Sequence, residues 1–376
     1  MKKEEAWCHF NATVVEGVTA EHIRRLHAYY IEHKDALARE WLEAFGSFCL
    51  KIRTMQEKGE KSPIGFIVCS MLRTSLLSGT YTDRLQAYDS TWFLDASECE
   101  ADYSAAWAFR FWEQWKHDLN VRRKAYFDAI SESQVVRLAL QKAPLFHLYV
   151  HHLIRYAMPR LLTMEEFRPI ATAEHFEIRA GEYMDITEQL YREERQTKDP
   201  IQALKWLKKK EELAYVYEVI PAIAGSGEDF AGLDFRYTIF RQADLTGSDM
   251  RFCIAMGTRF EDCSLSEADV RASCLHDADL RNCDLQGADF SEIHANQNTW
   301  DAEQCRYYGI EGINFTGANV AGASFAYAEL AGAYFIEAIV DGADFTGANL
   351  DGALFSKEAA ERLVLDESQR RSIRWV

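Results

Sequence analysis

A repeat of five residues runs through the last third of the sequence and constrains its fold more than any other feature. It is visible in ADLTG at 243–247, CDLQG at 283–287, ADFTG at 343–347 and ANLDG at 348–352. Neither an α-helix, with 3.6 residues per turn, nor a flat strand, with two, has a period of five. Self-similarity at a fixed period is typical of a solenoid, in which each repeat is stable only when it stacks on its neighbours.

Two of the five positions are predicted to form the core. The position two residues before the central one is small, and from Ala318 to Ala353 it is always alanine. Small residues allow tight corners, while stacked large side chains fill a narrow interior at high density. The central position holds a large apolar residue at Phe230, Phe235, Phe240, Leu245, Met250, Phe260, Leu265, Val270, Leu275, Leu280, Leu285, Phe290, Phe315, Val320, Phe325, Leu330, Phe335, Val340, Phe345, Leu350 and Phe355.

This stretch resembles the pentapeptide-repeat family, whose consensus is A(D/N)LXX. The resemblance implies a right-handed quadrilateral β-helix with four pentapeptides per coil, in which the central and small residues point inward. From 230 to 355 in steps of five there are 26 slots, or 6.5 coils. We therefore predict a β-helical solenoid over residues 228–356.

The segment 293–313 interrupts the repeat without changing its phase. It is either a distorted coil or a loop whose length happens to preserve the register. Trp300, Tyr307 and Tyr308 in this segment are candidate binding residues, because irregular segments on rigid scaffolds often bind partners. The alternative is that these rings fill a gap in the core.

The protein is predicted to be multidomain, with a mainly α-helical domain over residues 1–222 before the solenoid. A hairpin is expected around Gly181 within 174–190, Asp199 is expected to open a helix at Pro200, and 221–229 is expected to link the domains. We recognise no family in this half of the chain. Other helices are predicted from Thr19 to Phe45, over 64–77, 98–118, 122–142 (ending at Pro144) and 145–161, and after a capping box at Thr163 and Glu166.

The tail 357–376 follows the last repeat. Ser356 is a possible helix N-cap, and Leu363, Val364 and Trp375 give the tail an apolar side. A solenoid that simply stops exposes a sheet edge and the apolar cross-section of its last coil. We predict a capping helix from about 357 to 367, with a homodimer through this C-terminal end as the alternative.

Cysteine content and hydropathy indicate a cytoplasmic protein. We expect the protein to be bacterial. The nine cysteines include no CxxC pair, and Cys253, Cys263 and Cys283 fall on inward slots, which is typical of reduced core residues. No basic-then-apolar signal begins the sequence, and charged residues interrupt its longest apolar runs. We expect no contact with a membrane.

The negative charge belongs mainly to the repeats. The whole chain carries −17, and residues 226–376 hold 26 acidic and 12 basic residues, a net charge of −14. Taking every twentieth residue places Asp229, Asp249, Asp269, Asp289 and Glu329 on one face as an acidic ladder. Such a surface favours a protein partner with a basic surface over direct binding of nucleic acid. The alternative is that Asp is consensus architecture, since its side chain can bond nearby backbone amides.

His147, His151 and His152 are the nearest approach to a metal cluster in the sequence, because residues i and i+4 share a helix face. No HExxH arrangement accompanies them, and the apolar neighbours favour histidines that simply pack in the core. We therefore predict no catalytic residue, no metal site and no cofactor.

Three classes of function are compatible with these patterns. The first is a non-catalytic protein-interaction module that presents a rigid acidic β-helix and a helical domain. The second follows from the family resemblance: some members mimic B-DNA, bind type II topoisomerases such as gyrase, and protect them from quinolones or peptide toxins, which would make this an antibiotic-resistance protein. The third is an enzymatic or ligand-binding activity in the helical domain. The interaction module is the preferred interpretation.

Overall fold

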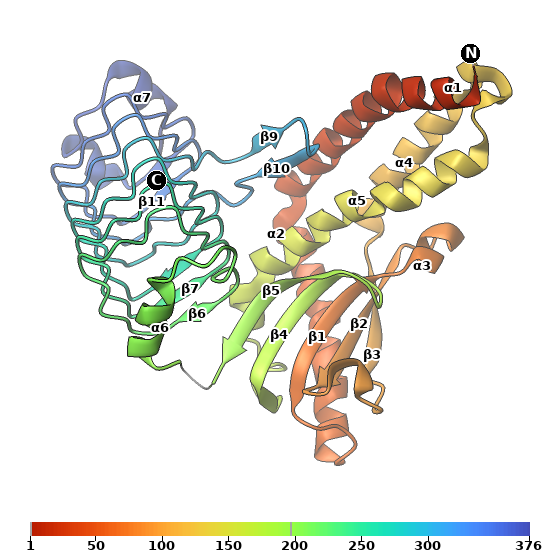
Figure 1. Ribbon diagram of the computed structural model, residues 1–376, viewed down its shortest axis with the longest axis horizontal. Coiled ribbons are helices and arrows are strands. Elements are labelled where there is room, and N and C mark those ends of the chain that lie inside the picture. Colours follow the sequence, from red (N-terminus) through yellow and green to blue (C-terminus); the bar gives the residue numbers. More distant parts are fainter. Residues whose placement is uncertain (1, 196–197) are drawn as a thin grey trace. The chain divides into compact units, whose positions relative to one another are not determined.

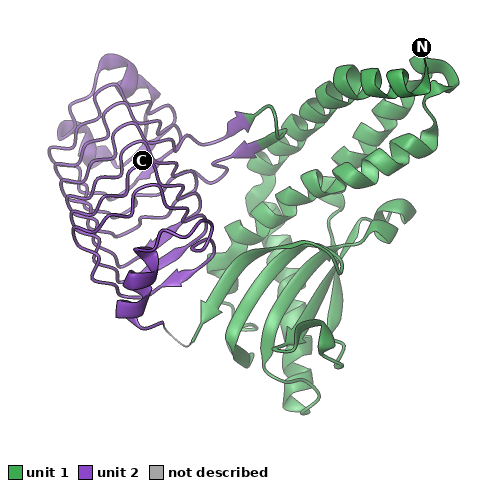
Figure 2. Cartoon of the chain, viewed as in Figure 1, with its two compact units in different colours: residues 1–195, 301–306 green, residues 196–300, 307–376 purple. Residues whose placement is uncertain are grey.

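The computed structural model describes residues 2–195 and 198–376. The chain divides into two compact units, which Figure 2 shows in different colours: unit 1 comprises residues 1–195 and 301–306, and unit 2 comprises 196–300 and 307–376. This boundary lies earlier than residue 222, where the sequence analysis placed it. The reason is that Ala203, Leu207 and Tyr215 share one hydrophobic core with the repeats.

The helical part of unit 1 is built on a long N-terminal helix (Figure 1). α1 (Lys3–Phe10) and a π-helical stretch (Asn11–Val15) lead into α2 (Glu16–Glu57), which packs against α4 (Ala106–Arg122) and α5 (Glu132–Leu161). A 3₁₀ segment (Arg123–Ala129) joins α4 to α5, and Ser131 caps α5 by accepting a bond from the backbone N–H of Gln134. Buried Trp112 and Trp115 of α4 donate hydrogen bonds to Ala139 of α5 and Thr19 of α2 in the core between these helices.

Unit 1 also contains a five-stranded sheet that the sequence analysis did not predict. Its strand order is β3-β2-β1-β4-β5, and only the central pair β1 and β4 is parallel. The strands are β1 (Ile64–Met71), β2 (Thr82–Asp89), β3 (Glu100–Ser104), β4 (Thr172–Glu182) and β5 (Thr187–Glu194), with α3 (Arg73–Ser78) after β1 and a 3₁₀ turn (Trp92–Leu94) after β2.

Several helix predictions in this half were wrong. Residues 64–77 form β1 and then α3, because a continuous apolar run suits a buried strand as well as a buried helix. The helix expected from 98 begins only at Ala106, after β3. α5 continues through Pro144 and joins the two predicted helices, but it begins at Glu132 and not at 122. The segment after Thr163 contains turns instead of a helix.

Two local predictions in this half were confirmed. The hairpin around Gly181 is present as β4 and β5, and a Cβ at Gly181 would lie 2.3 Å from the carbonyl oxygen of Ile186 on the returning chain. Asp199 caps α6 (Pro200–Leu207), because its side chain accepts bonds from the backbone N–H groups of Ile201 and Gln202.

Unit 2 is a stack of coils joined by parallel backbone pairing at intervals of twenty residues, or four pentapeptides. β6 (Val219–Ile220) pairs with β7 (Ile239–Arg241), and β7 pairs with β8 (Arg259–Glu261). Single parallel bridges continue the same step, for example from Ala224 to Asp244 and from Asp244 to Ser264. The first coil therefore begins near 219, and the stretch 221–229, which was expected to be a linker, is part of this coil. The predicted central residues are all buried.

The irregular segment is an insertion of fifteen residues between coils. Asp279 pairs with Asn314, a step of 35 residues where the other coils have twenty. The insertion carries the two-stranded hairpin β9 (Thr299–Asp301) and β10 (Arg306–Tyr308), so three of the 26 predicted slots lie outside the coils. Of the two alternatives, the loop excursion is therefore the one observed.

Both ends of the stack are covered by chain from outside the repeats. At the first coil, Ala203 and Leu207 of α6 join the core, and at the last coil Ala359, Leu363 and Ile373 do so. The tail is not the single helix predicted over 357–367. It consists of a 3₁₀ turn (Lys357–Glu361), α7 (Glu367–Ser372) and β13 (Arg374–Trp375), and β13 pairs in parallel with β12 (Leu354–Phe355), which itself pairs with β11 (Tyr334–Phe335).

Candidate functional site

The aspartates before the central residues have a structural role. Asp249 accepts a bond from the backbone N–H of Arg251 at 3.1 Å, and Asp269 accepts one from Arg271 at 3.2 Å. The same contact recurs around the coils, at Asp234, Asp244, Asp279, Asp284, Asp289, Asn314, Asn319, Asp344 and Asn349. Asparagine serves as well as aspartate, so this slot selects an acceptor oxygen and not a charge.

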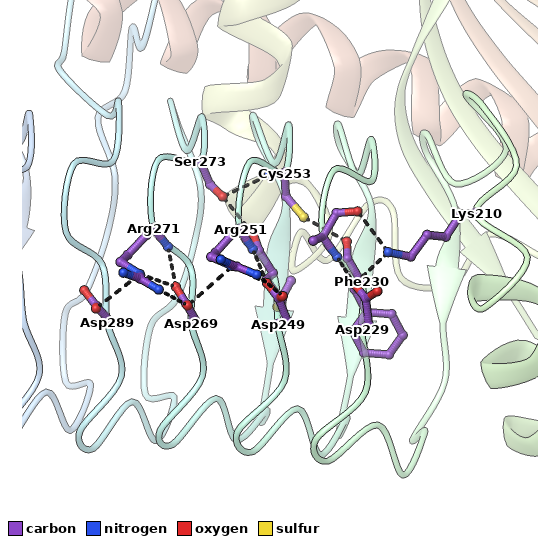
Figure 3. Close-up of polar contacts among 12 residues, drawn as sticks. Lys210, Asp229, Phe230, Asp249, Arg251, Cys253, Asp269, Arg271, Ser273 and Asp289 are labelled. Carbon is purple, nitrogen blue, oxygen red and sulfur yellow. Dashed lines mark hydrogen bonds and ion pairs between the residues drawn. The ribbon is translucent and has the colours of Figure 1, made fainter.

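Four of the five predicted ladder residues lie together. Asp229, Asp249, Asp269 and Asp289 are joined by successive parallel bridges, as Figure 3 shows. Glu329 was predicted to continue this ladder and does not. Asp289 is followed by Ser324, whereas Glu329 follows His294 on the next face. The insertion causes the difference, because it separates residues that a count in steps of twenty treats as neighbours.

Basic side chains offset most of the ladder's charge (Figure 3). Arg251 lies 2.7 Å from Asp249 and 3.5 Å from Asp269, and it holds the pKa of Asp249 below its usual range through its hydrogen bond and its charge. Arg271 bridges Asp269 and Asp289 at 2.6 and 3.4 Å in the same way. At the first rung, Lys210 pairs with Asp229 at 2.6 Å. Four carboxylates therefore face three cations.

A different face carries acidic side chains that are not offset in this way. Asp244, Glu267 and Asp284 are exposed, and no basic side chain within residues 2–195 and 198–376 pairs with them. Asp341, farther along the same face, pairs with Arg362 of the tail at 3.4 Å. Thr246 and Ser266 are polar outward side chains on this face, and Ile339 is an exposed apolar one. We call Asp244, Glu267, Asp284 and Asp341 the open acidic face.

The sequence analysis missed this face because it followed only the residue before each central one along a face, a position that does not include Glu267 or Asp341. The available signal was the residue two places after each aspartate. It is arginine at 251 and 271, after the ladder residues, whereas Thr246 and Gln286 follow Asp244 and Asp284. Comparing all outward positions of a face, and not only the aspartates, would therefore have shown which face lacks arginine.

The three aromatic residues of the insertion do not form a single cluster. Trp300 and Tyr307 lie on opposite strands of the β9–β10 hairpin, with ring centroids 4.9 Å apart. Tyr308 instead stacks on His276 of the preceding coil, at 6.3 Å. All three are partly buried.

Two of the three predicted histidines belong to a buried polar chain in unit 1. His147 contacts Asp83 of β2, and His151 contacts both His147 and Glu188 of β5. His152 lies apart from this chain and contacts the ring of Tyr149. Across the part of the chain that the structure describes, no three His, Cys, Asp or Glu side chains are arranged to hold a metal ion. Asp83 and Glu188 carried no sequence signal, because strands far apart in the chain bring them to the histidines.

Within the same described ranges, no helix is long and apolar enough to cross a membrane.

Comparison with known proteins supports the repeat assignment. The model of the family "Pentapeptide repeats" matches eight copies at residues 229–262, 263–294 and 313–352. A search of curated proteins gave no match. These three segments are therefore pentapeptide repeats, and the resemblance seen in the sequence is confirmed.

Solved structures of pentapeptide repeat proteins are also similar to part of this chain. Full-length QnrB1, a plasmid-mediated fluoroquinolone resistance protein, is 26% identical over 44% of this chain and 78% of its own, with a TM-score of 0.29. Rfr23 from the cyanobacterium Cyanothece 51142 is 19% identical over 40% of this chain and 95% of its own, with a TM-score of 0.19. A pentapeptide repeat protein of the Arabidopsis thaliana thylakoid lumen is 27% identical over 42% of this chain and 74% of its own, with a TM-score of 0.10. At such TM-scores these structures carry no argument about function.

Proposed function

We propose that this chain is a non-catalytic protein-interaction module whose repeats bind the basic surface of a protein partner through the open acidic face. One observation carries the proposal: Asp244, Glu267 and Asp284 are exposed and have no basic partner among the described residues, while the ladder is offset by Arg251 and Arg271. Like charges on a fixed scaffold create a field that steers and orients an oppositely charged partner.

The scaffold is suited to this role because its outward positions are fixed by backbone pairing. Four bridged positions per twenty residues support a quadrilateral cross-section, and we take the coil to be the right-handed β-helix that the family resemblance implies. A surface of this kind loses little conformational entropy on binding, since its side chains are short and its backbone is already ordered.

DNA mimicry at a type II topoisomerase is the second candidate. The acidic ladder was its main support, and Arg251 and Arg271 remove most of the charge that such mimicry needs. The open acidic face retains charge, so a topoisomerase stays among the partners to be tested. Self-association through the C-terminal end ranks lower, because the tail already covers the last coil.

The test neutralises the open acidic face and compares it with the ladder. In the full chain, Asp244→Asn, Glu267→Gln and Asp284→Asn are combined. Both asparagines keep the acceptor oxygen that bonds the backbone N–H two residues on. The matched control combines Asp249→Asn, Asp269→Asn and Asp289→Asn, which changes the net charge equally.

Partners are recovered from a lysate of the host with the wild-type chain, and their Kd is then measured for each variant. We expect the open-face variant to lose about tenfold or more in affinity and part of its salt dependence, while the ladder variant loses much less. Equal losses in both variants would mean that only the net charge matters. Recovery of gyrase or topoisomerase IV would promote mimicry, and salt-independent binding would contradict the proposal.

A further inference from the structure

Four carboxylates form a diamond across the open acidic face and its two corners. Asp244 and Asp284 lie one coil before and one coil after Ser264, because parallel bridges run from Asp244 to Ser264 and from Ser264 to Asp284. Asp262 and Glu267 lie on the same coil as Ser264, at the two ends of this face. Both have a positive φ, 53° and 58°, as at other corners of the coils.

The four side chains of the diamond are directed at solvent. All of them are exposed, and in the described parts of the chain no basic side chain forms an ion pair with them. The space beside Glu267 is open, because Gly247 and Gly287 occupy the same corner on the two neighbouring coils. Their negative charge is therefore available to a partner.

The diamond has a defined shape along the axis of the coils. Neighbouring coils are about 4.8 Å apart, so Asp244 and Asp284 lie about 9.6 Å apart along the axis. Asp262 and Glu267 lie halfway between them and are displaced to opposite sides. A partner that pairs with all four carboxylates must place its cations in three steps along the axis: one, then two side by side, then one.

An α-helix offers this arrangement at positions i, i+3, i+4 and i+7. With a rise of about 1.5 Å and a turn of about 100° per residue, positions i+3 and i+4 lie about 4.5 and 6 Å along the helix, on opposite sides of position i. Position i+7 lies about 10.5 Å along the helix and returns close to the line of position i. An extended strand does not fit, because its same-side residues form one straight row at intervals of about 6.6 Å.

The neighbouring face limits where such a helix lies. On that face Arg241 and Arg259 pair with Glu261 at 2.9 and 2.7 Å, and Arg281 pairs with Asp279 at 2.6 Å. Three arginines against two carboxylates leave an excess of positive charge, which repels cations placed beyond this corner of the diamond. A helix with a single basic stripe is thus favoured over a surface that is basic all round.

The chain itself places one cation on the open acidic face from a helical turn. Arg362 follows the 3₁₀ turn Lys357–Glu361, has φ and ψ of −93° and −22°, and lies 3.4 Å from Asp341. The next residue, Leu363, is buried and anchors this turn against the last coil. This face therefore already accepts a guanidinium group that a helical turn presents.

We propose that the partner meets the open acidic face with an α-helix that carries lysine or arginine at positions i, i+3, i+4 and i+7 and lies along the axis of the coils. Its two end positions pair with Asp244 and Asp284, and its two middle positions pair with Asp262 and Glu267. The helix is an element of the partner named in the proposed function, on which this inference rests.

The test uses the full chain and two helical peptides of about twenty residues, made of alanine and glutamine with the same number of lysines. One peptide carries its lysines at i, i+3, i+4 and i+7. Its isomer carries them at i, i+2, i+5 and i+7, which keeps the composition and the charge but turns two lysines to the opposite side. At low salt we expect the first peptide to bind with a Kd about fivefold lower than the isomer, measured by fluorescence anisotropy.

A pair of variants locates the contact. Asp262→Asn combined with Glu267→Gln should remove the difference between the two peptides, because the lysines at i+3 and i+4 lose their partners. Asp249→Asn combined with Asp269→Asn changes the net charge equally and should preserve the difference. A third peptide, with the first lysine pattern and a central proline that breaks the helix, should bind as weakly as the isomer.

Equal affinities of the two helical peptides would overturn the inference and leave the proposed function standing, since the face would then respond to charge alone. A proline peptide that binds as tightly as the first helix would overturn it as well. Absence of salt-dependent binding by either helical peptide would also overturn it, and the proposed function would then be decided separately, by the partner from the lysate and the open-face variant.

Discussion

Individual residues of the repeats carry two kinds of hydrogen bond that hold the coils together. Besides the aspartates, Ser, Thr and Cys in the small inward slot donate to the carbonyl group of a core residue 23 positions earlier. Examples are Thr258 to Phe235 at 2.6 Å and Ser273 to Met250 at 2.9 Å, and Thr238, Cys253, Cys263 and Cys283 do the same. Each bond joins one coil to the preceding one. Burial raises the pKa of Cys253 to about 12, so the thiol remains a neutral donor.

The stacked central rings are expected to carry most of the stability of the coils. Phe345 is fully buried and stacks on Phe325 with centroids 4.9 Å apart, whereas Phe252 is 64% exposed on an outward position. Phe345→Ala should lower the free energy of unfolding by about 3–5 kcal/mol, through lost burial and a cavity. Phe252→Ala should change it by less than about 0.5 kcal/mol. Urea denaturation measures both, and similar losses would contradict the predicted core.

The partly buried His152 makes the stability of unit 1 depend on pH. Its pKa is about 3 in the folded chain and about 6.5 when unfolded, so between these values the unfolded chain binds the proton and the folded chain does not. Stability should therefore fall as the pH drops from about 6.5 toward 3. His152→Gln should flatten this part of the urea-midpoint profile, and an unchanged slope would argue against a buried neutral ring. The same linkage applies to His151, because burial also lowers its pKa in the folded chain.

At the scale of elements, the insertion closes on one partly buried carboxylate. Asp277 accepts bonds from the backbone N–H groups of Ile310, Glu311 and Gly312, at 3.2, 2.7 and 2.9 Å, where the chain returns from the β9–β10 hairpin. Burial raises the pKa of this carboxyl group, and the three donors oppose that rise. If Asp277 were removed, these three backbone N–H groups would be left without an acceptor.

Replacing Asp277 should loosen the insertion without unfolding the coils. Asp277→Ala is expected to cost about 2–4 kcal/mol, since buried backbone donors lose a charged acceptor. Asp262→Ala is the control, because Asp262 has a similar positive φ of 53°, against 59° at Asp277, and is exposed. Limited proteolysis within 298–309 should accelerate only in Asp277→Ala. Equal cleavage in both variants would show that the carboxylate does not hold the insertion.

At the scale of the whole molecule, chain from outside the repeats covers both ends of the solenoid. β13 supplies one further parallel strand beyond β12, and Gln369 Nε2 donates to the carbonyl groups of Phe345 and Ala348 at 2.7 and 2.9 Å. The tail thus supplies hydrogen bonds to backbone carbonyl groups of the last coil and covers its apolar side chains. Natural solenoids need such covers because an open end is a template for aggregation.

Removal of residues 357–376 should expose the last coil. We expect the truncated chain to aggregate or to be lost from the soluble fraction, because Phe345 and Phe355 would face water at its end. Removing only residues 374–376 should cause less aggregation, since α7 and Leu363 would still cover part of the last coil. A truncated chain that stays monomeric and equally stable would contradict the capping role. A full-length dimer that becomes a folded monomer on truncation would instead assign the tail to a dimer interface.

The sequence alone determined the repeat, its phase and its core, because a five-residue period fixes which side chains point inward wherever coils stack. It also determined Asp199 as a cap and the hairpin around Gly181, which depend on residues close together in the chain. Tertiary structure decided the rest. The sheet of unit 1 could not be predicted because β1 pairs with β4 across more than a hundred residues. The fifteen-residue insertion moved Glu329 to another face, arginines between the rungs offset the ladder, and strands brought Asp83 and Glu188 to two histidines of α5. Charge and proton state depend on which groups meet in space, and a linear pattern does not contain that information.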